Sequence, residues 1–163
     1  MQTRIKIALL VAIVGVAAYA AGTVLATPPT GATALALAPV GQFPEIKAKA
    51  KIGDWKAGIK TKGVSDLHVN QITIQPGGTF GWHSHPGPSF VVVKSGTATF
   101  YEGDDPTCTG QVLPTGSSLF EPAGDVHIPR NEGSEPLVLV VIQLLPTGAI
   151  RRIDEPSPGN CPF

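Results

Sequence analysis

Three of the four histidines in this chain limit how it can fold. His83 and His85 are two residues apart, and His127 follows 42 residues later. In an extended strand alternate side chains project from the same face, so both imidazoles of a His-x-His pair point to one side without any bend. A fold that brings His127 to this side creates a three-histidine metal site. Each histidine alone is also compatible with a hydrogen-bonded core side chain.

The sequence around these histidines resembles the two motifs of the cupin superfamily. The first motif has the form G-x5-H-x-H-x3–4-E-x6-G, and the second has the form G-x5-P-x-G-x2-H-x3-N. The fixed positions that match are Gly77, His83, His85, Gly96, Gly116, Pro122, Gly124, His127 and Asn131. The glutamate of the first motif does not match, because counting back from Gly96 places Ser89 there. The resemblance covers about half of the chain, and it implies that the usual fourth protein ligand of the metal is missing.

Composition and turn residues predict an all-β fold. Nineteen glycines and sixteen prolines divide the chain into short stretches with little helical periodicity. We expect about nine or ten strands, and a double-sheet jelly roll or small barrel hides the edges of so many. The resemblance implies the same architecture, the double-stranded β-helix of cupins. The barrel is expected over residues 43–150 as one domain, after a linker or loosely attached strand over residues 27–42.

Two predicted strands have contrasting patterns. Residues 45–52, E-I-K-A-K-A-K-I, alternate between apolar residues and lysines, which is typical of a half-buried strand at an exposed sheet edge. A patch that binds anionic partners is the alternative for these lysines. Residues 137–145, L-V-L-V-V-I-Q-L-L, are apolar on both faces, which indicates a central strand covered on both sides. Gln143, its one polar residue, is expected to face a wet cavity or another buried polar group.

The amino terminus is typical of an export signal. M-Q-T-R-I-K is followed by an apolar segment that ends in V-L-A at Ala26. A basic start, an apolar middle and small residues before the cleavage point predict a signal peptide over residues 1–26. An uncleaved anchor is the alternative, because about 20 apolar residues can also span a bilayer. Either segment predicts an exported protein that is secreted or held in the cell envelope, with membrane contact only if the leader is retained.

Export also determines the interpretation of the two cysteines. An even number of cysteines in an oxidising compartment favours a disulfide, here between Cys108 and Cys161. A catalytic or metal-binding cysteine is the alternative, but the sequence has no Cys-x-x-Cys spacing. The disulfide is expected to tie the tail, residues 151–163, to the barrel.

The metal is predicted by class and not by element. Three neutral imidazoles bind Zn, Fe, Cu, Ni or Mn, so we expect a divalent transition metal ion. Without a carboxylate ligand the ion keeps its full charge, which favours Lewis-acid chemistry, and Ser89 could contact it through a water. Candidates for orienting the ligands or transferring protons are Tyr101, Glu102, Glu121 and Gln143. Strand parity allows at most one of Tyr101 and Glu102 to point into the barrel.

Two hypotheses for function follow. The first is an exported metalloenzyme that acts on a small molecule, an oxidoreductase of the dioxygenase type, since three-histidine cupins include the thiol dioxygenases. The second is a non-catalytic module of the cell envelope that binds a metal or small ligand. Nucleic acid is excluded as a partner, because ten basic against twelve acidic residues remain once Arg4 and Lys6 leave with the leader. The resemblance also implies a homodimer, because cupins often pair through sheet edges.

Overall fold

The computed structural model describes residues 25–163. This part of the chain contains thirteen strands and no helix. The all-β prediction is therefore confirmed. Strands outnumber the nine or ten expected because several are only two to four residues long. Within the same range, no helical segment is available to cross a membrane. The predicted leader lies outside the described residues except for its last two positions.

In chain order the strands are β1 (Thr30–Ala36), β2 (Gly41–Phe43), β3 (Lys47–Ile52), β4 (Trp55–Lys60), β5 (Ser65–Thr79), β6 (His83–Ser84), β7 (Ser89–Ser95), β8 (Thr97–Glu102), β9 (Gln111–Pro114), β10 (Ser118–Glu121), β11 (His127–Arg130), β12 (Leu137–Pro146) and β13 (Ile153–Asp154).

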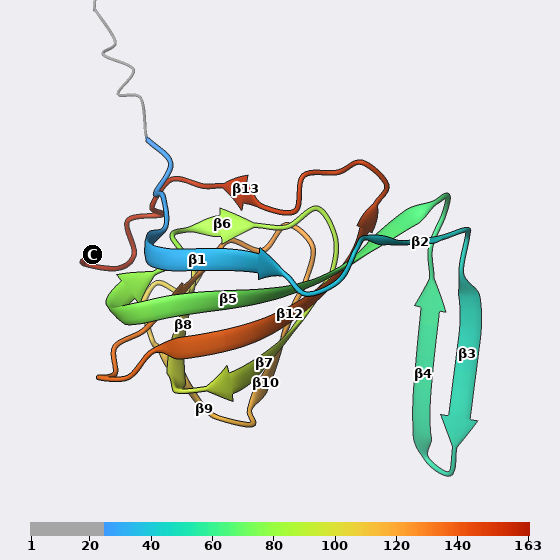
Figure 1. Ribbon diagram of the computed structural model, residues 1–163, viewed down its shortest axis with the longest axis horizontal. Helices are drawn as coiled ribbons and strands as arrows, with labels where there is room; N and C mark the ends of the chain where they lie inside the picture. Colours follow the sequence, from blue (N-terminus) through green and yellow to red (C-terminus); the bar gives the residue numbers. More distant parts are fainter. Residues whose placement is uncertain (1–24) are drawn as a thin grey trace, which may run out of the picture.

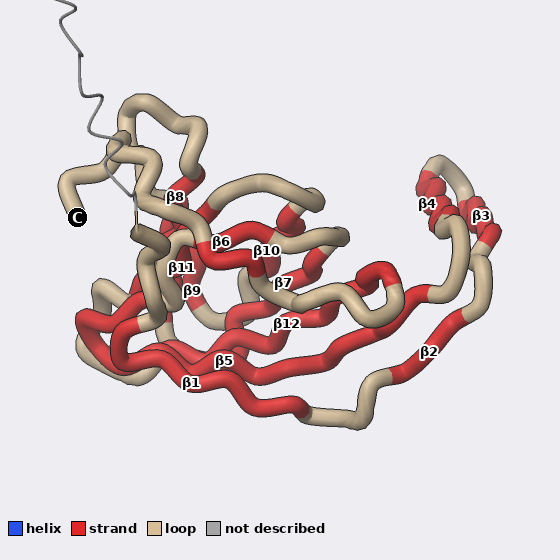
Figure 2. The backbone as a smooth tube through the Cα atoms, turned by 90° about the horizontal axis from the view of Figure 1, so that it is seen from above, coloured by secondary structure: helices blue, strands red, loops and turns tan. Residues whose placement is uncertain are grey.

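Eleven of these strands form one antiparallel sheet that curves into a nearly closed barrel (Figures 1 and 2). The order along its main path is β10-β7-β12-β5-β11-β6-β13, and β8 connects β11 to β9. The longest pairing joins β12 to β5 over ten residues. The barrel resembles a jelly roll because sequential hairpins alternate with long crossings, as the double-stranded β-helix requires.

The core of the barrel comes from alternate residues of its long strands. Inward side chains of β5, β7 and β12 pack together with those of β8, and each is less than a tenth exposed. Burying each large aliphatic side chain stabilises the fold by about 1.5–3 kcal/mol. Gly96 turns the chain between β7 and β8 with φ of 80°, and an added Cβ would lie 2.8 Å from the Pro136 carbonyl oxygen. This explains why the first motif ends in glycine.

Three segments can be compared with their sequence-based descriptions. Of the linker and the loosely attached strand offered for residues 27–42, the strand applies to residues 30–36, which form β1 and pair with β5 through residue 36. The alternating pattern at 45–52 does form a strand, β3, but the prediction of half-burial was wrong because all six residues of β3 are exposed. Central strand β12 lies between β7 and β5, yet its outward side is open, with Ile142 36% exposed.

The hairpin of β3 and β4 stands apart from the barrel as a separate two-stranded sheet (Figure 1). Its base is closed by reciprocal hydrogen bonds, since the Thr61 amide donates to the Ile46 carbonyl and the Ile46 amide donates to the Thr61 hydroxyl. The range expected for the barrel, residues 43–150, therefore includes an arm that lies outside it.

The carboxyl-terminal tail packs onto the barrel and forms a second small core. The predicted disulfide between Cys108 and Cys161 is confirmed, and β13 of the tail pairs with β6. Beneath the tail, Trp82 and Ile128 are buried against Cys161. Trp82 directly precedes His83, and the tail covers it to 1% exposure.

Candidate metal centre

Two neighbouring strands bring the three histidines together. His83 on β6 is the direct cross-strand partner of His127 on β11, and His85 follows His83 on the same side. The nitrogens available as ligands lie within 4.8 Å of one another across the three residues, and all three side chains are buried. The fourth histidine, His68, stays outside this group, which agrees with its sequence spacing.

Backbone carbonyl groups hold each imidazole by its Nδ1 atom. Because a carbonyl oxygen only accepts, each Nδ1 carries the hydrogen and leaves the Nε2 lone pair free. The pairs are His83 with Gly81 at 2.8 Å, His85 with Arg151 at 2.7 Å, and His127 with Asp125 at 3.0 Å. Metal-binding histidines are typically oriented in this manner.

Glu121, at the end of β10, brings a carboxylate to the cluster. Its two oxygens lie 3.3 Å from Nε2 of His85 and 3.2 Å from Nε2 of His127, and the side chain is 6% exposed. Neither His127 Nε2 nor one of the Glu121 oxygens has a well-oriented hydrogen-bond partner in the described part of the chain. Buried polar atoms are normally satisfied. The imidazole Nε2 atoms and the Glu121 oxygens are therefore arranged around a common point and not as well-oriented hydrogen-bond pairs. Atoms that bind a cation have this arrangement.

Ser89 lies between two longer polar side chains. Across β10, β7 and β12 the register places Glu121 opposite Ser89 and Ser89 opposite Gln143. Ser89 is fully buried, and its hydroxyl accepts a hydrogen bond from the Gln143 amide at 3.2 Å. The same amide donates to the Arg151 carbonyl at 3.3 Å, the carbonyl that also accepts from Nδ1 of His85. Gln143 is thus paired with buried polar groups, as the sequence predicted for the polar residue of β12.

The pKa values of three ionisable groups in the cluster are shifted in different directions by their surroundings. Burial and the charges of His127 and His85 hold the pKa of His83 well below its usual value. Burial alone would raise the pKa of Glu121, but hydrogen bonding to His127 and His85 outweighs it and lowers that pKa. Burial likewise opposes charge on His127, whose pKa is nevertheless raised by the Glu121 carboxylate. The Glu121 carboxylate and a protonated His127 thus each favour the charged form of the other.

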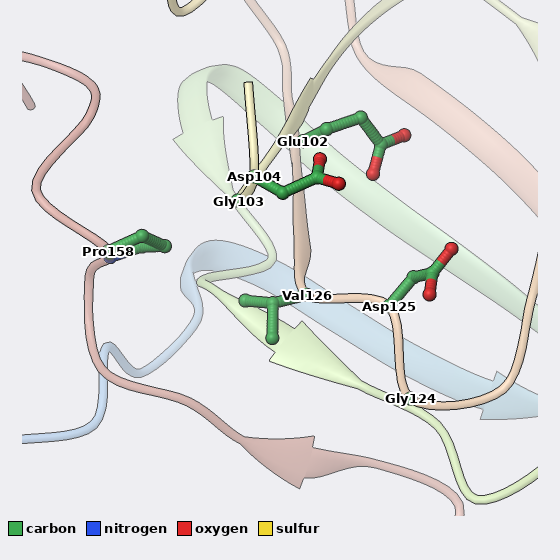
Figure 3. A pocket seen from close by; sticks show the side chains of 7 residues that line it. All are labelled: Glu102, Gly103, Asp104, Gly124, Asp125, Val126 and Pro158. Carbon is green, nitrogen blue, oxygen red and sulfur yellow. The ribbon is translucent and has the colours of Figure 1, made fainter. Parts of the chain in front are cut away.

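Of the four residues that the sequence offered for proton transfer, Tyr101 lies away from the histidines. It donates a hydrogen bond to the Glu132 carboxylate at 2.9 Å and packs against Phe163 of the tail. Glu102 is the cross-strand partner of His127, and it lines a cleft of about 350 Å³ with Asp104 and Asp125 (Figure 3). Burial raises the pKa of Glu102.

A small cavity opens beside the histidines. About 60 Å³ is available in it, which corresponds to roughly two water molecules. Its polar wall consists of six residues, His83, His85, Glu121, Gln143, Arg151 and Arg152. The apolar wall includes Ile72, Phe80 and Val141. A ligand that enters this space meets the histidine nitrogens directly, and it has to be small.

Sequence reasoning proposed Glu121 for proton transfer and missed its place among the possible metal ligands. The motif comparison drew attention to Ser89, where the usual carboxylate is absent. The sequence did contain one signal. Glu121 is the last residue of the stretch S-L-F-E, directly before Pro122 of the second motif, so strand parity limits its side chain to one of the two faces of that strand. Only the pairing of β10 with β7 turns that signal into a position next to the histidines.

A family model described as a cupin domain matches residues 70–143. No curated protein matches the chain. A cupin-like protein from Thermotoga maritima has a solved structure with 25% identity and a TM-score of 0.49, over 56% of this chain and 65% of that one. A conserved protein with a double-stranded β-helix domain from Klebsiella pneumoniae has 23% identity and a TM-score of 0.47, over 69% of this chain and 85% of that one. An oxalate oxidase in complex with glycolate has 24% identity and a TM-score of 0.43. The alignment covers 47% of this chain and less than half of the oxalate oxidase, 41%.

Proposed function

The chain carries a domain of the cupin superfamily over residues 70–143, and we propose that this domain binds a divalent transition metal ion through His83, His85 and His127. One observation supports this proposal most directly. All three Nδ1 atoms are engaged by backbone carbonyls, so three Nε2 lone pairs converge within a buried space. Packing alone gives no reason for three buried lone pairs to meet, whereas a cation does.

Glu121 is the fourth protein ligand in this proposal and takes the part that the first cupin motif gives to its glutamate. Its carboxylate already lies within 3.3 Å of two of the three Nε2 atoms. Ser89 is too short to reach them, and its hydroxyl is held by Gln143. This replaces the expectation of an ion that keeps its full charge, because one carboxylate lowers the net charge of the centre by one.

We further propose that the protein is exported and that the metal serves an oxidation of a small molecule, in the manner of a dioxygenase. A bound transition metal ion supplies Lewis acidity and redox capacity at the cavity. The chain itself orients the histidines, excludes bulk water with the apolar wall and limits the ligand to a few non-hydrogen atoms. Gln143 provides an amide that can hydrogen-bond such a ligand at the same wall.

A non-catalytic module that binds a metal or small ligand is the second candidate. It is favoured because Tyr101 and Glu102 do not line the cavity. The one acidic side chain that does line it, Glu121, is a proposed metal ligand and is therefore not free to act as a general acid or base. The same metal site serves both candidates, so they differ only in turnover.

Metal content of the purified protein tests the shared part of both candidates. We expect about one ion per chain by elemental analysis. His83→Ala should remove most of it, and the matched variant His68→Ala should keep it, because His68 lies outside the cluster. Protein that contains no stoichiometric transition metal under metal-replete conditions would contradict the proposal.

Consumption of dioxygen distinguishes the two candidates. Metal-loaded protein is incubated with a panel of small thiols, hydroxy acids and carboxylates while dioxygen is followed with an electrode. The enzyme proposal predicts consumption that depends on one of these compounds and disappears in His83→Ala. Binding of a compound with no turnover across the panel favours the module.

A further inference from the structure

The hairpin of β3 and β4 has two chemically opposite faces. Cross-strand partners in an antiparallel pair share a face. The register runs from the pair Lys47–Lys60 to the pair Ile52–Trp55 at the tip. One face therefore carries five lysines, Lys47, Lys49, Lys51, Lys56 and Lys60. The other carries only apolar side chains, Ala48, Ala50, Ile52, Trp55, Ala57 and Ile59.

The apolar face of this hairpin has no cover within the described part of the chain. Ile52 is 77% exposed, Trp55 59% and Ile59 52%, and the hairpin pairs with no other strand. An isolated two-stranded hairpin is marginally stable in water at best. The turn Gly53-Asp54, in which Gly53 has φ of 58°, sets the two strands in register but adds no packing. The pattern thus indicates a surface that is completed by a partner.

A second uncovered apolar surface lies on the outward side of the barrel. Across β10, β7, β12 and β5 the register aligns Phe120, Phe90, Ile142 and Val69 in one row. Phe90 and Phe120 are each 52% exposed, and their rings lie 5.1 Å apart between centroids. We call this row the outer apolar row. It explains why β12 is apolar on both faces although only one of them packs into the core.

One groove connects the two surfaces. It has a volume of about 480 Å³, and its wall includes Ile59 of the hairpin as well as Phe90 and Phe120 of the outer apolar row. A single partner seated in the groove contacts both surfaces. A flat bilayer cannot follow such a concave shape.

We propose that the partner is a second copy of this chain, and that the hairpin of each copy lays its apolar face over the outer apolar row of the other. Each copy offers both a projecting arm and an open sheet face, which is what a twofold interface requires. The exposed apolar side chains of both surfaces present on the order of 800 Å² per copy, about the amount that a stable interface buries on each partner. The lysine face stays in water in this arrangement. The proposal is independent of the metal centre, which lies on the inward side of the same sheet.

Sedimentation of the purified protein over a range of concentrations tests the proposal. We expect a reversible dimer. The double variant Trp55→Ser, Ile59→Ser should raise the dissociation constant by about 30-fold or more, because aromatic anchors dominate interface energies. Lys49→Ser with Lys51→Ser, on the opposite face of the same strands, should leave it unchanged. Since the hairpin lies outside the barrel, both variants should keep the parent's thermal unfolding midpoint when all are compared at a concentration at which the parent is monomeric.

Photo-crosslinking locates the contact independently of affinity. With p-benzoylphenylalanine in place of Trp55, crosslinks should map to peptides of β7 and β10 in the other copy. A monomer at about 0.1 mM, a dimer that the apolar double variant leaves intact, or crosslinks to other strands would each overturn the proposal. So would monomers that bind phosphatidylserine vesicles through Trp55 and Ile59, because that result identifies a lipid surface as the partner.

Discussion

Glu121 and Ser89 are direct cross-strand partners on β10 and β7, and only Glu121 reaches the histidine cluster. The carboxylate that the first cupin motif carries at the position of Ser89 has its counterpart one strand away. Both side chains point into the barrel because directly opposed residues share a face. The proposed ligand set would therefore keep its chemistry while one member changes strand.

The first prediction is that Glu121→Gln lowers affinity for the metal by about 100-fold or more, because it removes the carboxylate that lies within 3.3 Å of two of the histidines while keeping the shape. Isothermal titration with Zn²⁺ or Fe²⁺ measures this. Glu135→Gln is the matched control, since Glu135 is exposed and lies outside the histidine cluster. Equal losses in the two variants would mean that overall charge, and not ligation by Glu121, determines affinity.

The second prediction concerns restoration of the motif. Ser89→Glu alone should not tighten metal binding, because it adds a second carboxylate and extra volume at a position with no exposed surface. Overpacking of this kind costs about 1–3 kcal/mol of stability. The exchange variant Ser89→Glu, Glu121→Ser should bind the metal again within about tenfold of the parent, since it moves the carboxylate back by one strand. If the exchange variant binds no better than Glu121→Ser, then the carboxylate cannot be supplied from β7.

The third prediction is that metal affinity falls as the pH is lowered. The raised pKa of His127 means that the metal-free cluster holds a proton at a pH where an ordinary histidine has lost it. A metal ion must displace this proton, so affinity decreases as the pH falls toward and below the folded pKa of His127, by up to about tenfold per pH unit for one proton. The same raised pKa stabilises the metal-free fold below the unfolded value of about 6.5, and this contribution is lost as the pH rises through the folded pKa.

Titration calorimetry in buffers of different ionisation enthalpy counts the protons released on metal binding. In the parent, proton release should increase as the pH falls toward the folded pKa of His127 and approach about one proton per ion below it. Glu121→Gln should release less, because the carboxylate that raises the pKa of His127 is gone. Release of no proton by the parent would contradict the charge state assigned to the His127–Glu121 pair.

The histidine cluster could be predicted from sequence because strand parity is local. His83 and His85 share a face in any strand, and the second motif gave His127. Glu121 could not be assigned in the same manner, because its place depends on the register between β10 and β7, a pairing of residues about 30 positions apart. Which residue reaches the cavity is decided by this non-local register.

Burial was harder to predict than strand formation. Alternation at 45–52 correctly indicates a strand, but it cannot tell whether the apolar face is covered by the same chain, and here it is not. Trp82 shows the converse case. Strand parity predicts that it points away from His83, and it is buried only because the tail, held by Cys161, crosses that side of the barrel.

The fourth prediction concerns Asn131, the last residue of the second motif. Its amide nitrogen donates to the carbonyls of Ile74 and Glu135, both at 2.8 Å, and its oxygen accepts from the Gly133 amide at 3.1 Å. The side chain is 1% exposed. Asn131→Ala should lower the free energy of unfolding by about 2–3 kcal/mol, because buried backbone groups lose their partners. Urea unfolding measures the change, and the metal stoichiometry of the folded variant should stay the same. A loss below about 0.5 kcal/mol would show that water replaces the amide.

The last prediction concerns the disulfide and the tail. Cys108 and Cys161 are 53 residues apart, and closing a loop of this length stabilises the fold by up to about 4 kcal/mol. Replacing both cysteines with serine should therefore lower the free energy of unfolding by as much as this amount. It should also release the tail from Trp82, which lies beneath it. In a Trp55→Phe background Trp82 is the only tryptophan, so its exposure can be followed by a red shift of its fluorescence emission. An unchanged emission maximum in the serine variant would mean that the pairing of β13 with β6, and not the disulfide, keeps the tail in place.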